Sequence, residues 1–184
     1  MNLGGFDWVD LIILALIIAS LAVGFAQGML RQMIGLAALY LAMVLAAQYY
    51  IPLGNFIRAI MFQPTSRFLN VISFFIILVA VWSLIIGLAF DAYSSTKLRL
   101  LPLVDHLGGS ILGFASVIVA LTLVLPVISF MVGEPWPGNE SVRSTIDLGM
   151  QVSRLVPIFA SIKPEILAWL APWLPMGLPS IFNL

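Results

Sequence analysis

The chain has 184 residues, of which 62% are hydrophobic and 9% are charged, and its formal net charge is +0. Soluble domains carry about 25% charged residues, so this composition excludes an ordinary soluble protein and indicates an integral membrane protein whose first partner is the lipid bilayer. The neutral balance argues against a nucleic-acid partner, and the absence of cysteine excludes disulfides and thiolate sites.

Four apolar segments are long enough to cross a bilayer, which takes about 20 helical residues. Backbone groups must be paired inside hydrocarbon, so each segment is predicted to be a helix and the fold to be all-α. The first segment is preceded by Asp7 and contains Asp10 rather than following basic residues, so we expect a retained span and not a cleaved signal peptide. The predicted spans cover residues 8–28, 33–50, 69–90 and 107–132.

The connections between the spans differ in length and composition. Only a few residues around Arg31 separate the first two spans, which are therefore predicted to form a tight antiparallel hairpin. Residues 51–67 contain two prolines and are predicted to form a surface loop with a short interfacial helix near 56–62. Residues 91–105 are predicted to form a polar turn, and Pro126 should kink the fourth span.

The composition changes after Gly133. A linker rich in proline and glycine is followed by apolar residues at helical spacing over 141–162 and then by a proline-rich stretch with two tryptophans. Closely spaced prolines interrupt helices, so we expect short amphipathic helices at the membrane interface rather than a fifth span. The predicted organisation is a four-span membrane domain over 1–133 and a linker with an interfacial helical tail over 134–184.

The orientation in the membrane is predicted from the basic residues that flank the spans, which are enriched on the cytoplasmic side. The segment before the first span contains no Lys or Arg and two Asp residues, which favours an outer location. An even number of spans places both termini on one side. We therefore expect a multi-pass plasma-membrane protein with both termini outside.

The pair Asp105–His106 includes the only histidine of the chain. Adjacent residues on a helix do not face each other, so the pair lacks the geometry of a Ser–His–Asp arrangement. Asp105 precedes the fourth apolar segment, where a carboxylate would cap a helix N-terminus, and the imidazole could change its charge near neutral pH. One histidine and no cysteine also disfavour a metal site. We expect no catalytic residue, no metal and no cofactor.

Ionisable residues fall at the ends of the spans rather than in their interiors. We interpret Asp10, Arg31, Asp105 and His106 as rim charges at the level of the lipid headgroups, with a buried functional carboxylate at Asp10 as the alternative. Coupled transporters usually keep ionisable groups near the midplane. Polar residues inside the spans, such as Gln48, leave a channel or transporter subunit as the second functional hypothesis.

Small residues recur four positions apart at two places. Gly24 and Gly28 form one G-x-x-x-G, which Ser20 extends by one turn, and Gly109 and Gly113 form another. Residues four apart share one helix face, and glycines there let two backbones approach closely. The sequence therefore predicts two helix-packing faces, and it leaves open whether their partner lies within the chain or in another molecule.

These residues resemble the opening signature of the CvpA family, named for colicin V production. An acid, an apolar run, a serine, glycines and an arginine follow one another in DLIILALIIASLAVGFAQGMLRQ, and Asp105 is followed by glycines at four and eight residues. The resemblance covers roughly residues 6–131. Relatives often carry a basic residue where this chain has Gln27 and another where it has His106, so roles that need those charges do not transfer.

The resemblance implies an inner-membrane protein linked to toxin production and envelope homeostasis, in a family with no agreed biochemical activity. In some relatives a protease domain on the secreted side follows the membrane domain, which also implies an outer C-terminus. We therefore expect a small non-enzymatic membrane protein in colicin V production or export and envelope homeostasis. It would act through helix packing and assembly, as a homo-oligomer or with other membrane proteins.

Overall fold

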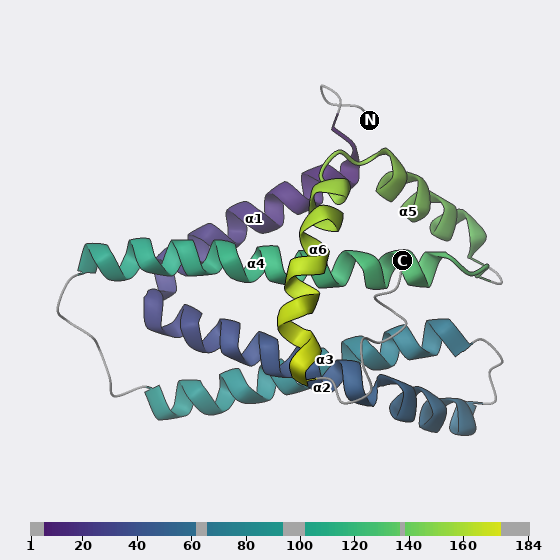
Figure 1. Ribbon diagram of the computed structural model, residues 1–184, viewed down its shortest axis with the longest axis horizontal. Coiled ribbons are helices and arrows are strands. Elements are labelled where there is room, and N and C mark those ends of the chain that lie inside the picture. Colours follow the sequence, from purple (N-terminus) through teal and green to yellow (C-terminus); the bar gives the residue numbers. More distant parts are fainter. Residues whose placement is uncertain (1–5, 62–65, 94–101, 137–138, 174–184) are drawn as a thin grey trace.

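The computed structural model describes residues 6–61, 66–93, 102–136 and 139–173, and within these ranges the chain is built from helices (Figure 1). The predicted all-α class is confirmed. The helices are α1 (Trp8–Gln27), α2 (Met29–Met61), α3 (Ser66–Tyr93), α4 (Pro102–Val132), α5 (Glu140–Val152), α6 (Val156–Leu170) and the short 3₁₀ helix η1 (Ala171–Trp173).

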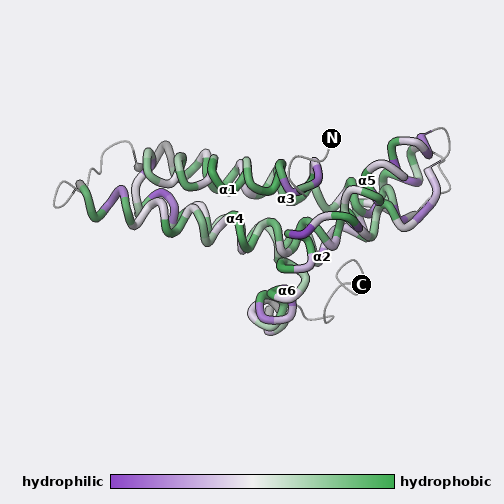
Figure 2. The backbone as a smooth tube through the Cα atoms, turned by 90° about the horizontal axis from the view of Figure 1, so that it is seen from above, coloured by the Kyte–Doolittle hydropathy of each residue, from purple (hydrophilic) through white to green (hydrophobic). Residues whose placement is uncertain are grey.

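Helices α1 to α4 are long and apolar enough to cross a membrane, as predicted. Hydrophobic residues run along these helices, whereas hydrophilic ones gather on α5 and its connection to α4 (Figure 2). The chain is therefore a multi-pass membrane protein. The segments that are long and apolar enough to cross a membrane are Trp8–Gln27, Met29–Ile60, Arg67–Ala89 and Leu103–Val132.

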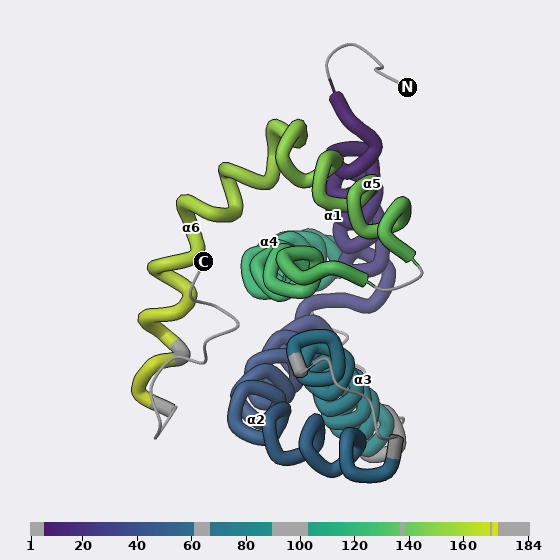
Figure 3. Tube along the Cα trace, turned by 90° about the vertical axis from the view of Figure 1, so that its right-hand side faces the viewer, coloured from purple at the N-terminus to yellow at the C-terminus, as the bar shows by residue number. Residues whose placement is uncertain are grey.

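The four long helices form two closely packed pairs, α1 with α4 and α2 with α3. Helix α4 lies in the middle, with α1 and α5 on one side, α2 and α3 on the opposite side, and α6 along a third (Figure 3). The predicted tight hairpin of the first two spans is wrong, because α1 and α2 meet at Gly28 and share few other contacts. Gly28 has φ +81°, which ends α1 and sends α2 off in another direction.

The second helix is longer than predicted. It runs through Pro52 to Met61, so the predicted loop over 51–67 is helical for most of its length. Proline removes one backbone hydrogen bond, but tertiary packing holds this part of α2 against the start of α3. Gly54 is buried there, and a Cβ on it would lie 3.4 Å from Ser73 Oγ. Much of the predicted polar turn over 91–105 falls outside the described residues.

Helix α4 supplies side chains to both hydrophobic cores of the molecule. Leu123 and Val127 belong to the core shared with α2 and α3, whereas Leu121 and Leu125 belong to the core shared with α1 and α5. The tail helix α6 also reaches both cores (Figure 3), through residues at its two ends. Helix α6 is thus packed against the long helices and forms part of the folded body.

The apolar spacing over 141–162 predicted short helices, and the structure forms two, α5 and α6, which are separated at residues 153–155. Pro157 lies in the first turn of α6, where the missing N–H costs nothing because that group has no helical partner. A helix that starts here exposes free N–H groups at its N-terminus, and these need acceptors from elsewhere.

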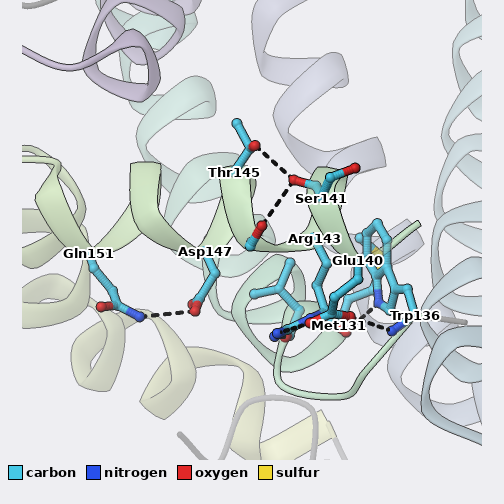
Figure 4. A network of polar contacts seen from close by, with 10 residues as sticks. Met131, Trp136, Glu140, Ser141, Arg143, Thr145, Asp147 and Gln151 are labelled. Carbon is cyan, nitrogen blue, oxygen red and sulfur yellow. Dashed lines mark hydrogen bonds and ion pairs between the residues drawn. The ribbon is translucent and has the colours of Figure 1, made fainter. Parts of the chain in front are cut away.

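The connection from α4 to α5 is closed by a polar network (Figure 4). Arg143 Nη1 donates to the carbonyl oxygen of Val132 at 2.8 Å, and Trp136 Nε1 donates to that of Met131 at 3.1 Å. Both carbonyls belong to the last turn of α4, where helical partners are missing. Glu140 accepts from Arg143 Nε at 2.7 Å and from the Trp136 backbone N–H at 3.2 Å.

We expect acid to loosen this connection. The hydrogen bond from Arg143 and that from the Trp136 backbone hold the pKa of Glu140 below its ordinary value of 4.5. A carboxylate whose pKa is lowered by folding stabilises the folded state above its unfolded-state pKa, and this contribution is lost as the pH falls through the lowered value. The protection of the α5 amides against hydrogen exchange, measured relative to the intrinsic exchange rate at each pH, should therefore fall as the pH drops below 4.5.

The matched variants are Glu140→Gln, which should remove this acid step, and Glu165→Gln on α6, which should keep it. Residue 165 is exposed and lies outside the network. An acid step of the same size in Glu140→Gln would show that another group causes it.

Candidate functional site

Two glycine faces meet where α1 packs on α4, and we call Gly24, Gly28, Gly109 and Gly113 the glycine crossing. All four residues are buried. A Cβ on Gly113 would lie 2.5 Å from the carbonyl oxygen of Ser20, and one on Gly109 would lie 2.8 Å from the carbonyl carbon of Gly28. The two backbones are thus in direct contact, which only glycine permits. In this structure each face has the other face of the same chain as its partner.

Asp105 links the glycine crossing to the start of α2. Its Oδ1 accepts a hydrogen bond of 2.8 Å from the N–H of Met29, the first residue of α2. The prediction that Asp105 caps its own helix is wrong, because α4 begins three residues earlier, at Pro102. The carboxylate instead satisfies a free N–H of α2, which the sharp turn at Gly28 brings beside α4.

His106 and Ser110 bind carbonyl groups of α1 along the same crossing. His106 Nδ1 lies 2.6 Å from the carbonyl oxygen of Phe25, and the two rings stack with centroids 4.8 Å apart. Ser110 Oγ donates to the carbonyl oxygen of Leu21 at 3.2 Å. Nδ1 must carry a proton to donate here, which selects the Nδ1–H tautomer of the neutral ring or the charged ring. His106 and Asp105 thus engage different backbone groups rather than each other.

Asp10 is fully buried, with 0% of its surface exposed, although it lies in the first turn of α1. The interpretation of Asp10 as a rim charge at headgroup level is therefore corrected: the carboxylate faces the protein. Residues 153–155, which connect α5 to α6, cover it. We call Asp10 and these three residues the Asp10 junction.

Both carboxylate oxygens of Asp10 accept two hydrogen bonds. Oδ1 accepts from Ser153 Oγ at 2.6 Å and from the Leu155 N–H at 3.0 Å. Oδ2 accepts from the N–H groups of Arg154 at 3.3 Å and Asp7 at 3.1 Å. Four donors around one carboxylate offset the cost of burying its charge.

The Asp10 junction anchors the N-terminal end of α6. Ser153 Oγ also accepts from the N–H of Val156 at 3.1 Å, so the acid and the serine together satisfy the free donors of this helix end. The negative charge also faces the positive end of the α6 dipole. At the other end of α6, the Tyr40 hydroxyl donates to the carbonyl oxygen of Trp169 at 3.0 Å. The tail helix is therefore held by α1 at one end and by α2 at the other.

Arg31, the remaining predicted rim charge, lies within the first turn of α2 and is exposed. It lines a cavity of about 410 Å³ between the four long helices, together with Gln27 and Gln32. The sequence placed Arg31 in the turn between the first two spans, whereas the turn is at Gly28.

The geometry of these groups serves packing. Asp105 and His106 bind backbone groups of neighbouring helices, and Asp10 binds the connection between α5 and α6, so none of the three side chains pairs with another. Among the residues that the structure describes, no three histidine, aspartate or glutamate side chains gather as a metal site would require. The glycine crossing was visible in the sequence as a spacing, but residues 153–155 of the Asp10 junction were missed. Pro157, which marks the start of a helix, was the available signal.

Comparison with known proteins gives one match. The family model described as colicin V production protein matches residues 9–164. The match extends past the segment that carried the resemblance, so it includes α5, the Asp10 junction and α6 as far as Pro164. Neither the curated proteins nor the solved structures gave a match.

Proposed function

We propose that this chain, which belongs to the colicin V production protein family, is a non-enzymatic membrane scaffold for toxin production or export and for envelope homeostasis. The observation that carries the proposal is the Asp10 junction. It joins the amphipathic helix α5 and the apolar helix α6 to the membrane body through a buried carboxylate. A scaffold needs a surface that is fixed to its membrane anchor, here the exposed face of α5, so that a partner finds it in one orientation.

The non-enzymatic role is supported by how the candidate reactive groups are used. In a Ser–His–Asp arrangement the acid orients the imidazole, but here His106 Nδ1 lies at the carbonyl oxygen of Phe25 and Asp105 binds the N–H of Met29. If His106→Ala abolished a turnover measured with the purified protein, this part of the proposal would be wrong.

The proposed location is the inner membrane, with both termini and helix α5 on the outer side. The first turn of α1 and the last turn of α4 lie toward the same end of the molecule (Figure 1), as an even number of spans requires. Cysteine labelling with a membrane-impermeant reagent at exposed positions of α5 tests this. Labelling of intact cells is expected, and labelling only after lysis would reverse the orientation.

The alternative function, a channel or transporter subunit, can be tested at Asp10. A carboxylate on a transport path must exchange ions or protons, whereas Asp10 has all its bonds within the protein. Flux through reconstituted vesicles that depends on Asp10 or Gln48 would favour transport over the scaffold.

The scaffold is tested by toxin output from cells that rely on this chain. Leu148 and Val152 lie four residues apart on α5 and expose 60% and 62% of their surface, which suits a partner contact. The double variant Leu148→Ser, Val152→Ser should lower extracellular colicin V activity while the protein keeps its level in the membrane. Thr145→Ala, also exposed on α5, is the control. Unchanged toxin output after deletion of the whole gene would overturn the proposal.

A further inference from the structure

The cavity of about 410 Å³ lies between the two helix pairs, where α1 and α4 separate from α2 and α3. Sites for small molecules occupy roughly 300–1,000 Å³, so this space can take a chain-like ligand. Protein interiors are otherwise packed as densely as organic crystals. A cavity of this size in a membrane protein is therefore a candidate binding site for a ligand or a lipid.

The cavity has a polar mouth and an apolar interior. Gln27, Arg31 and Gln32 line it where α1 passes into α2, whereas Leu39 and Ala120 line it further along α2 and α4. The two serines in its wall are already satisfied, since each hydroxyl donates to a carbonyl of its own helix. Trp82 adds an indole N–H on the α3 wall, and the charged and amide donors of the cavity are those of the mouth.

The mouth is built to bind an anion. Among the described residues that line the cavity, Arg31 is the one ionisable side chain, and a guanidinium matches phosphate oxygens with its planar fork of donors. Gln32 is 9% exposed, and its amide is fixed by a hydrogen bond of 3.1 Å from its Nε2 to Gln27 Oε1. The amides of these two residues thus stand in fixed positions beside the cation.

The depth of the cavity matches one acyl chain. Arg31 and Leu39 are eight residues apart on α2, which is about 12 Å along a helix. The hydrocarbon core of a bilayer is about 30 Å thick, so one leaflet is about 15 Å deep. A headgroup at Arg31 would therefore place its chain within a single leaflet.

We propose that this cavity binds an anionic phospholipid from the bilayer, with one acyl chain between the helix pairs and the phosphate at Arg31. The lipid fills the space that the helices leave open and joins the α1–α4 pair to the α2–α3 pair. This inference stands independently of the scaffold proposal, because it rests on the shape and the charge of the cavity alone.

Gly35 allows the cavity to be filled without disturbing the backbone. It lines the space, and the nearest neighbour that an added Cβ would meet is Ile86 Cδ1 at 4.0 Å. Gly35→Leu should therefore occupy the site of the acyl chain. Gly87→Leu is the matched control, because a Cβ on this α3 glycine would meet nothing within 4 Å and the residue does not line the cavity. Ala120→Leu fills the site from the opposite wall.

The experiment titrates the delipidated full-length protein in detergent with phosphatidylglycerol or phosphatidylcholine of the same acyl chains, and native mass spectrometry counts the bound lipids. We expect one phosphatidylglycerol bound roughly tenfold more tightly than phosphatidylcholine. Gly35→Leu and Ala120→Leu should lose this lipid, and Gly87→Leu should keep it. Binding in both filled variants as tight as in Gly87→Leu would place the lipid elsewhere and overturn the proposal.

The charge is tested separately. Arg31→Gln should bind both lipids with similar affinity, whereas Arg58→Gln, near the other end of the same helix, should keep the preference for phosphatidylglycerol. Equal affinity of the unmodified protein for the two lipids would overturn the proposed recognition of the anionic headgroup.

Discussion

Gly109→Ala is expected to lower the free energy of unfolding by about 3 kcal/mol or more, the upper part of the range for overpacked sites. The added Cβ would overlap the carbonyl oxygen of Gly24 and lie 2.8 Å from the carbonyl carbon of Gly28. A flexible side chain could rotate away from such a contact, but a helix backbone cannot. The two helices must therefore separate, and the side-chain bonds along the crossing lengthen with them.

The matched control is Gly87→Ala, which makes the same chemical change in α3. Its Cβ would meet nothing within 4 Å, so the variant should gain up to about 1 kcal/mol from the higher helix propensity of alanine. Thermal unfolding in detergent of the two variants and the parent protein measures both effects. Equal stabilities would show that α1 and α4 do not touch at Gly109.

A second readout separates local separation of the helices from general unfolding. If α1 and α4 move apart, Met29 loses the Asp105 acceptor and its amide should exchange faster. The amides of the α2–α3 core should keep their protection until the protein unfolds. Faster exchange in α3 alone would contradict this account.

The four spans could be predicted because apolar length is a local property, and the ends of the first and last spans agree with the helices within a few residues. The extent of α2 could not, because Pro52 is a local signal for a loop whereas the packing of Gly54 against α3 is not local. The glycine spacings indicated close packing because they too are a local pattern. Which helix packs against each glycine face depends on how the helices pair, and the spacing of the glycines carries no information about that pairing.

The burial of Asp10 and the partners of its carboxylate could not be predicted from the sequence. Its position one turn into a span is typical of an acid at headgroup level, and nothing near it in the sequence indicates burial. Three of its four hydrogen-bond partners are more than 140 residues away. The available signal in the sequence was Pro157, which indicates the start of a helix. A helix that begins inside a packed protein needs acceptors for its free N–H groups, and a nearby buried acid can supply them.

Asp10→Asn is expected to destabilise the protein by about 3 kcal/mol, since unsatisfied buried donors cost about 1–3 kcal/mol each. Each oxygen of the carboxylate accepts two hydrogen bonds. An asparagine side chain has one oxygen, so its amide group must face two of the four donors. Asparagine has the same shape as aspartate, but its NH₂ group is a donor that faces other donors. Turning the side chain over only exchanges which donors lose their acceptor.

The loss should appear first at the tail. The backbone amides of Arg154 and Leu155 should exchange hydrogen faster in Asp10→Asn, and Asp10→Ala, which leaves all four donors without an acceptor, should accelerate them further. Asp147→Asn is the control: this α5 carboxylate accepts one exposed hydrogen bond, from Gln151, so its change should stay within about 0.5 kcal/mol. Unchanged exchange at residues 154 and 155 would mean that the contacts of α6 with α2 and α4 hold the tail helix without Asp10. Faster exchange would instead show that Asp10 attaches the tail helix to the membrane helices. The proposed scaffold depends on this attachment.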